Sequence, residues 1–174
     1  REELLDRNIQ KGVATVLTQV EVDPQDPAFR NPTKPIGAFM TEEEARRMVA
    51  ERGYDVMEDS GRGWRRVVAS PKPVSVIELD TIQALVESDH IVVACGGGGI
   101  PVFKTEGHHL KGAAAVIDKD FASEKMAEQL NADRLIILTA VEKVAVNFGK
   151  PDQRWLDSLT PGEARRYMDG GQFA

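Results

Sequence analysis

The sequence is poor in cysteine, histidine and aromatic residues: it has one cysteine, three histidines and 6% aromatic residues in 174 positions. A single cysteine cannot form a disulfide within the chain, so we expect a cytoplasmic protein in a reducing environment. The chain also lacks any apolar run approaching the roughly 18 residues of a membrane-spanning helix. We therefore expect no membrane partner.

An excess of basic residues is absent as well. The formal net charge is −6 and the isoelectric point is about 5.2, and no basic stripe is interleaved with aromatic residues. Both features argue against a protein that binds nucleic acid electrostatically. The length suits one domain with a sizeable core, or a domain with a small excursion.

Residues that commonly bind metals or attack substrates are few and scattered. His90, His108 and His109 have no helical pair spacing, and no Asp, Glu or Cys partners stand at metal-ligand spacing. We interpret them as surface histidines and predict no metal site formed by protein side chains. Cys95 follows an apolar run without a recognisable Cys-His arrangement, which favours a core thiol.

A glycine run is the most informative feature of the sequence. The apolar segment 91–95 has the length and β-branching of a buried parallel strand, and Gly96, Gly97, Gly98 and Gly99 follow it directly. Backbone without Cβ atoms can approach an anion closely, although such a run is also typical of a plain turn. The run lacks the Lys-Ser/Thr ending of a Walker loop and the Gly-x-Gly-x-x-Gly spacing of a dinucleotide fold.

A second junction lies about twenty residues further on. The apolar segment 115–117 leads into Asp118, Lys119 and Asp120, and a helical pattern covers 121–131. A lysine between two carboxylates can be held charged and directed at phosphate, whereas the alternative is helix capping beside a solvated lysine. The two junctions together predict a phosphate site.

The predicted elements alternate between strands and helices. We expect strands at 13–20, 91–95, 134–139 and 144–147, and helices at 79–88, 121–131 and from Thr160 onwards. This order is typical of an α/β protein with a parallel sheet, whose ligands bind beyond the carboxyl ends of the strands. The glycine run, residues 118–120 and Thr139 all fall at such ends.

Residues 23–73 differ in character, because they contain six of the nine prolines. We predict that they form an excursion from a core made of 1–22 and 74–174, with irregular backbone at 31–37. A capping box of Thr41 and Glu44 begins a helix that Gly53 ends. Segment 61–68 carries three arginines and a tryptophan, which suits either a hairpin with a solvated basic edge or a lid whose cations reach an anionic ligand. Lys34, between two prolines, has the same two interpretations.

The sequence resembles the carbamate kinases of the amino acid kinase superfamily. The resemblance covers nearly the whole chain in order, and its segments are 13–20, 31–37, 61–68, 70–73, 95–102, 115–125 and 147–151. It implies a three-layer α/β/α sandwich with a mainly parallel sheet, a homodimer, and a protruding lid subdomain at 23–73. The implied reaction moves a phosphoryl group between MgATP and carbamate, or from carbamoyl phosphate to ADP in arginine fermentation.

The resemblance also implies roles for individual residues. Lys119 would stabilise the phosphoryl group in flight, Asp120 would organise the catalytic lysines, and Lys34 would reach in from the lid. The residues that would hold substrate or phosphate are Gly96, Gly97, Gly98, Gly99 and Asp118. Those that would lie by the nucleotide are Thr139, Asn147, Phe148 and Lys150.

Parts of the family pattern are missing from these 174 residues. We find no second glycine-rich loop, no His-Gly-Asn-Gly-Pro-type segment, and no lysine beyond the last helix. Both ends resemble interrupted helices, so we expect an interior piece that has little or no kinase activity alone. The alternatives are another amino acid kinase, or a non-catalytic nucleotide-binding or dimerisation module.

Overall fold

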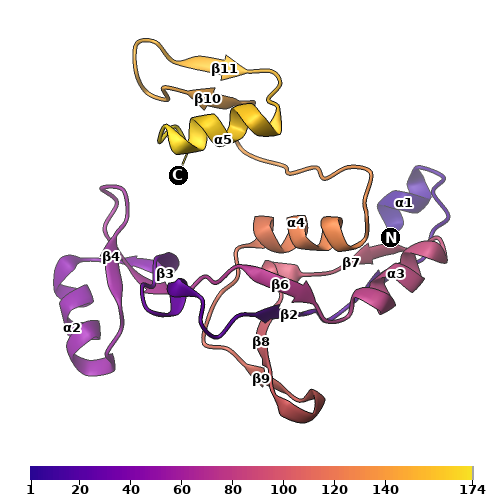
Figure 1. Cartoon of the computed structure of the whole chain (residues 1–174), viewed down its shortest axis with the longest axis horizontal. Helices are drawn as coiled ribbons and strands as arrows, with labels where there is room; N and C mark the ends of the chain where they lie inside the picture. The colour runs from indigo at the N-terminus through magenta and orange to yellow at the C-terminus, as the bar shows by residue number, and fades with distance from the viewer. Residues whose placement is uncertain (174) are drawn as a thin grey trace. The chain divides into compact units, whose positions relative to one another are not determined.

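The computed structural model describes residues 1–173. It divides the chain into two compact units, Arg1–Leu135 and the segment from Ile136 onwards. Helices and strands occur in both units (Figure 1). The predicted α/β class is confirmed.

Two small sheets form the core of the first unit. The larger has the strand order β6 (Pro73–Val76), β2 (Gln19–Val22), β8 (Ile100–Lys104) and β9 (Leu110–Gly112). β2 and β8 run parallel, whereas β6 and β9 join the sheet antiparallel. The other sheet pairs β1 (Val13–Thr15) with β7 (Ile91–Val93) in parallel.

Helices cover these sheets. They are α3 (Leu79–Glu87) and α4 (Lys119–Gln129), whereas the short α1 (Glu2–Asp6) has no buried residue. α4 packs against β6, and the core beneath it contains Val20, Val76, Ile82, Ile117 and Ala122, each at most 4% exposed. The predicted helices at 79–88 and 121–131 are therefore confirmed, with α4 beginning two residues earlier than predicted.

The predicted strand at 13–20 is interrupted. Its first part is β1 and its last part belongs to β2, and the break falls at 16–18. There the Thr18 hydroxyl donates to the Val16 carbonyl at 2.9 Å, which is a local bond that competes with a strand ladder. The break lets one segment pair first with β7 and then with β8.

Residues 34–68 contain a separate sheet, which we name the lid sheet after the predicted lid subdomain. Its order is β3 (Lys34–Met40), β5 (Trp64–Val68) and β4 (Val56–Glu58), all antiparallel, and α2 (Glu42–Arg52) packs against it. The capping box of Thr41 and Glu44 and the left-handed Gly53 are both present, so this helix prediction is confirmed. The boundaries 23–73 stay a prediction.

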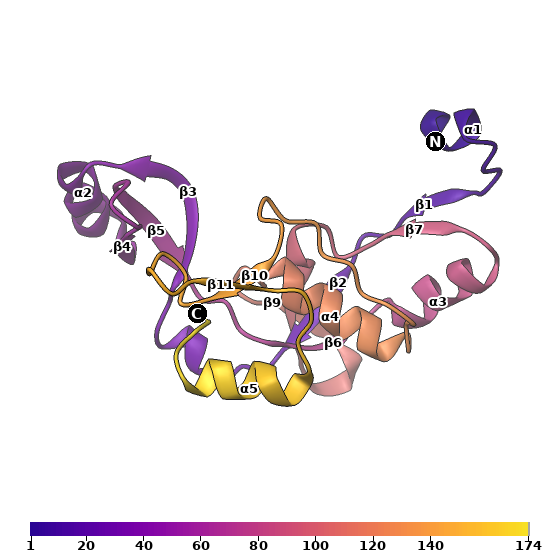
Figure 2. The ribbon, with the colours of Figure 1, turned by 90° about the horizontal axis from the view of Figure 1, so that it is seen from above.

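The prediction of irregular backbone at 31–37 is wrong for its second half, because β3 begins at Lys34. Pro35 is tolerated there because β3 is an edge strand of the lid sheet, so its missing N–H need not serve a second neighbour. The register shifts between Ile36 and Met40, and Gly37 lies in this bulge with φ of 72°. Figure 2 shows the resulting curvature of β3.

The second unit has a hairpin and a helix. β10 (Val144–Val146) pairs antiparallel with β11 (Arg154–Leu156), and α5 (Pro161–Asp169) follows. Thr160 and Glu163 form a capping box at the start of α5, as predicted. The predicted short strand near 144–147 is also confirmed.

The predicted strand at 134–139 is wrong. These residues have no regular secondary structure and no ladder partner, and Ile136 and Leu138 are 77% and 92% exposed. A strand requires a neighbour that satisfies its backbone groups, and none of the strands that the structure describes lies beside this run. A run of apolar and β-branched residues is therefore not sufficient to form a strand here.

Candidate phosphate site

The glycine turn, Cys95–Gly99, follows β7 and has a conformation that only a glycine-rich segment adopts easily. Three consecutive residues, Gly97, Gly98 and Gly99, have φ of 68°, 102° and 80°. A Cβ at Gly98 would lie 2.3 Å from the Ile117 carbonyl oxygen, so the turn packs directly on the backbone that leads into α4. Gly96 and Gly97 have open space where a Cβ would point, which leaves that side of the turn accessible.

A buried threonine anchors this turn, and the sequence analysis did not identify it. Thr18 is 3% exposed and accepts a hydrogen bond from the Cys95 backbone N–H at 2.9 Å. Its own carbonyl accepts from the N–H of Ile100, at the other end of the turn. The only signal in the sequence is a polar residue inside an apolar strand pattern.

The start of α4 presents the second half of the site. Asp118 is the N-cap, and its side chain accepts from the Asp120 backbone N–H at 2.9 Å. The ammonium of Lys119 lies 3.4 Å from the Asp120 carboxylate, and the two side chains are 71% and 51% exposed. Such an exposed pair is weak, so Lys119 can meet an anion at little cost.

Lys34 joins the lid sheet to this helix start. Its ammonium donates to the Asp118 carboxylate, and both side chains are about 70% buried, with 29% and 30% exposed. The Lys34 hydrogen bond is the main reason that the pKa of Asp118 lies below its ordinary value, and the Asp120 N–H and the charge of Lys119 act in the same direction against desolvation. Asp118 is therefore ionised at neutral pH.

The structure thus brings together five of the predicted features: the glycine run, Asp118, Lys119, Asp120 and Lys34. The glycine turn contacts α4, Asp118 and Asp120 stand at the first turn of that helix, and Lys34 reaches Asp118 from a strand 84 residues earlier in the chain. Two lysines, a helix N-terminus and an open glycine backbone suit an anion with several oxygens. Asp118 pairs with Lys34 and Asp120 pairs with Lys119, so each carboxylate is at least partly neutralised by a lysine.

The arginines of segment 61–68 are engaged within the lid sheet. Arg62 and Arg65 both bind Asp59, and the guanidinium of Arg66 lies 3.9 Å from the centre of the Tyr54 ring. β4 and β5 form the hairpin that one interpretation predicted. Among the residues that the structure describes, these contacts favour the hairpin interpretation over a lid whose arginines bind an anionic ligand.

The four predicted nucleotide residues lie in the second unit. Asn147, Phe148 and Lys150 share the turn after β10, where the Asn147 side chain donates to Asp152 at 2.7 Å. Phe148 is 70% exposed and packs edge-on against Trp155. Thr139 lies apart from this turn in the sequence, and its hydroxyl donates to the Val141 carbonyl at 2.7 Å.

The cysteine and the histidines, all within the described residues, show no sign of a nucleophile or of a metal site. Cys95 is 6% exposed within the core, where burial raises the pKa of its thiol, so the core-thiol interpretation is confirmed. His108 and His109 are exposed, as predicted for surface histidines, whereas His90 is only partly exposed and its ring nitrogen lies 2.9 Å from the Ser88 carbonyl oxygen. Across residues 1–173, no three or more His, Cys, Asp or Glu side chains gather closely enough to hold a metal ion, and no helix is long and apolar enough to cross a membrane.

Comparison with known proteins identifies one family. The model of the amino acid kinase family matches residues 31–174. A carbamate kinase-like protein of Escherichia coli, YqeA, is 61% identical over the whole chain, and the carbamate kinase of Clostridium perfringens is 58% identical over the whole chain. The chain spans 56% and 55% of their lengths, which is about half of each relative.

Solved structures agree with this result. The carbamate kinase of Giardia lamblia bound to AMP-PNP matches 99% of the chain with a TM-score of 0.83 and 42% identity. The same enzyme bound to citric acid matches 99% of the chain with a TM-score of 0.89 and 40% identity. The chain covers 55% and 54% of these two structures.

Proposed function

The chain belongs to the amino acid kinase family, and we propose that the complete protein transfers a phosphoryl group between ATP and carbamate. The observation that carries the proposal is the meeting of Lys34 with Asp118, at the helix start that packs on the glycine turn. Identity of 58% to a carbamate kinase supports the choice of substrate. The working direction that we propose is from carbamoyl phosphate and ADP to carbamate and ATP.

The chemistry needs little beyond alignment and charge. Carbamate already carries an oxyanion nucleophile, so no strong general base is required. When carbamoyl phosphate is formed, a carbamate oxygen attacks the γ-phosphorus of ATP. The bond from that phosphorus to the oxygen that bridges it to the β-phosphate breaks, and ADP leaves with that oxygen. The catalyst must hold two anions in line and neutralise the charge that accumulates on the transferred group.

The residues of the site divide this work between them. The N–H groups of Gly98 and Gly99 already donate to the Cys95 and Gly96 carbonyls within the turn, so the backbone N–H groups of Gly96 and Gly97 would hold the carbamate or the transferred phosphate. Lys119, the most exposed cation at the helix start, would neutralise charge on the group in flight. Lys34 would bind the same group from the lid, and the ion pairs with Asp118 and Asp120 would orient the two ammonium groups.

The nucleotide would be bound by the second unit. The exposed ring of Phe148 offers a stacking face, and Asn147, Lys150 and Thr139 offer polar groups. The carbamate kinase of Giardia lamblia, which is similar to this chain, has been solved bound to AMP-PNP, and this supports a nucleotide ligand. Mg²⁺ would accompany the nucleotide, held by phosphate oxygens and water, because Mg²⁺ is usually bound through substrate phosphates with few protein ligands.

Assembly and location complete the proposal. We expect a homodimer, because the resemblance to carbamate kinases implies one, and a cytoplasmic location, because the chain has a single cysteine.

A panel of acyl phosphates tests this function. The complete protein, with MgADP, should form ATP from carbamoyl phosphate at least about a hundredfold faster, by kcat/KM, than from acetylglutamyl or aspartyl phosphate. A preference for one of the other acyl phosphates would assign a different amino acid kinase. Tight ADP binding without turnover of any of the three would instead indicate a non-catalytic nucleotide-binding module.

A further inference from the structure

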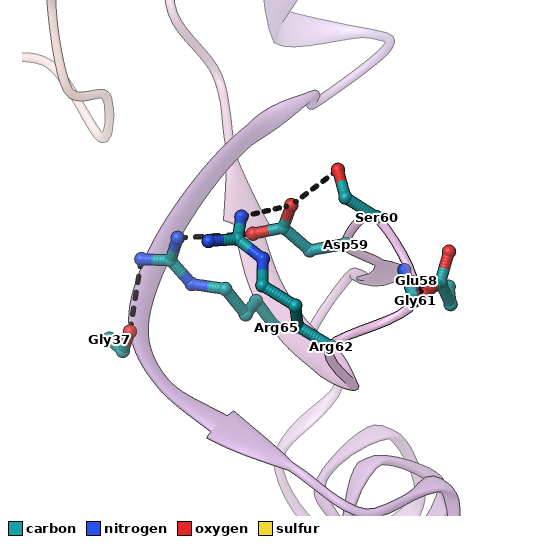
Figure 3. A network of polar contacts seen from close by, with 7 residues as sticks. All are labelled: Gly37, Glu58, Asp59, Ser60, Gly61, Arg62 and Arg65. Carbon is teal, nitrogen blue, oxygen red and sulfur yellow. Dashed lines mark hydrogen bonds and ion pairs between the residues drawn. The ribbon is translucent and has the colours of Figure 1, made fainter. Parts of the chain in front are cut away.

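A network of polar contacts holds the tip of the lid sheet against strand β3 (Figure 3). The carboxylate of Asp59 accepts from Arg62 at 3.0 Å, from Arg65 at 3.2 Å and from the Ser60 hydroxyl at 3.2 Å. The same Arg65 guanidinium donates through its other terminal nitrogen to the Gly37 carbonyl at 3.0 Å. Arg65 therefore bridges the β4–β5 turn and the middle of β3.

The bond to Gly37 falls where β3 lacks a ladder. β3 pairs with β5 from Lys34 to Ile36 and again at Met40, and the register shifts between these points. Gly37 lies in the gap with a left-handed backbone. A side-chain donor at this carbonyl satisfies a group that the strand pairing leaves free, and it fixes the bend of the bulge.

The network is partly shielded from water. The Asp59 and Arg65 side chains are 13% and 23% exposed. The guanidinium groups of Arg62 and Arg65 lie 5.0 and 5.2 Å from the centre of the Phe39 ring, which is also on β3. Burial alone would raise the pKa of Asp59, but the hydrogen bonds from both arginines outweigh it and hold that pKa below its ordinary value.

Lys34 stands three residues before Gly37 on this strand and carries the bond to Asp118. We propose that Arg65, oriented by Asp59, is a positioning residue: it holds the bend of β3 and so keeps the Lys34 ammonium at the phosphate site. This inference rests on the proposed function. Arg65 does not itself contact the glycine turn or α4 through any hydrogen bond or ion pair of the described residues.

Two arginines on the same carboxylate provide a matched pair of variants. Arg65→Ala removes the bridge to Gly37, whereas Arg62→Ala removes a partner of Asp59 and of the Phe39 ring, with 63% of its side chain exposed, and leaves the bridge to Gly37 intact. Arg65→Lys keeps the charge but lacks the fork that serves two acceptors at once. In the complete protein we expect Arg65→Ala and Arg65→Lys to raise KM for carbamoyl phosphate about fivefold to thirtyfold, and Arg62→Ala less than about twofold.

A double variant separates positioning from general damage to the fold. If Arg65 acts through Lys34, then Arg65→Ala should leave KM for carbamoyl phosphate nearly unchanged once Lys34→Ala is present. An equally large increase in that background would overturn the inference. So would equal effects of Arg65→Ala and Arg62→Ala.

Amide hydrogen exchange makes the test independent of the reaction. In the complete protein, Arg65→Ala should accelerate exchange in residues 34–40 and leave α4 and the core sheet unchanged. Unchanged exchange in β3 would contradict the positioning role even if the protein proved to be an active carbamate kinase. The converse result is a complete protein that forms no ATP although Arg65→Ala still accelerates exchange in residues 34–40. That result would support the structural role of Arg65 and would reject the proposed function.

Discussion

Gly98 is the position where one added methyl group should disturb the site most. Its φ of 102° is unfavourable for any residue with a Cβ, and that Cβ would stand 2.3 Å from the Ile117 carbonyl oxygen. Restoring an ordinary van der Waals distance requires the turn and the start of α4 to separate by about 1 Å. Together, backbone strain and overpacking should lower the free energy of unfolding by about 2–4 kcal/mol.

The neighbouring glycines are built-in controls for Gly98→Ala. Gly97 has φ of 68° but open space at the Cβ position, so Gly97→Ala measures backbone strain alone. Gly96 has open space and no positive φ, so Gly96→Ala should change stability by less than about 0.5 kcal/mol. Urea unfolding of the three variants in the complete protein should rank their losses as Gly98, then Gly97, then Gly96.

Activity provides a second measure of the same displacement. A shift of about 1 Å between the glycine turn and Lys119 should lower kcat for ATP formation by on the order of 10² in Gly98→Ala. If Gly98→Ala is no less stable than Gly97→Ala, the close packing of the turn on Ile117 is refuted. If its stability falls but kcat does not, the turn is structural and does not hold substrate.

Three further predictions follow from single contacts. In steady-state kinetics, Lys34→Ala should raise KM for carbamoyl phosphate at least about tenfold and leave KM for ADP unchanged. Lys72 is an exposed lysine of the same excursion, and Lys72→Ala should leave both KM values unchanged. Equal changes in KM for carbamoyl phosphate in the two variants would show that Lys34 does not belong to the site. Folding lowers the pKa of Asp118 from its ordinary value of 3.8, so the contribution of Asp118 to stability is present above that value and is lost as the pH falls through the lower pKa of the folded state. Urea unfolding should therefore show the wild-type advantage over Asp118→Asn shrinking below about pH 4, and a constant difference would contradict this. Thr41→Ala should lower the free energy of unfolding by about 1 kcal/mol and Thr41→Ser by much less, because only the alanine loses the cap of α2.

Local signals in the sequence predicted local structure well. Both capping boxes, at Thr41 and Thr160, begin helices where predicted, and Gly53 ends its helix in the left-handed conformation. Each of these features depends on residues within four positions of each other, so its pattern can be recognised in the sequence alone. The glycine run after β7 was recognisable for the same reason.

Features that depend on distant partners were predicted less well. The run 134–139 has strand composition, but strand formation requires a neighbour with free backbone groups. β3 was missed because Pro35 is compatible with an edge strand, and edge position is a property of the sheet. Thr18 and the Lys34–Asp118 bond join segments more than 70 residues apart, and no spacing rule reports such contacts.

The most direct test of the phosphate site is the effect of Lys119→Ala on ATP formation from carbamoyl phosphate and MgADP by the complete protein. We predict that kcat falls by on the order of 10² to 10³ while KM for ADP changes little, because Lys119 stabilises charge that develops only during transfer. A kcat equal to that of the wild type would contradict the account, since the glycine turn and the start of α4 could then not be the place where the phosphoryl group moves.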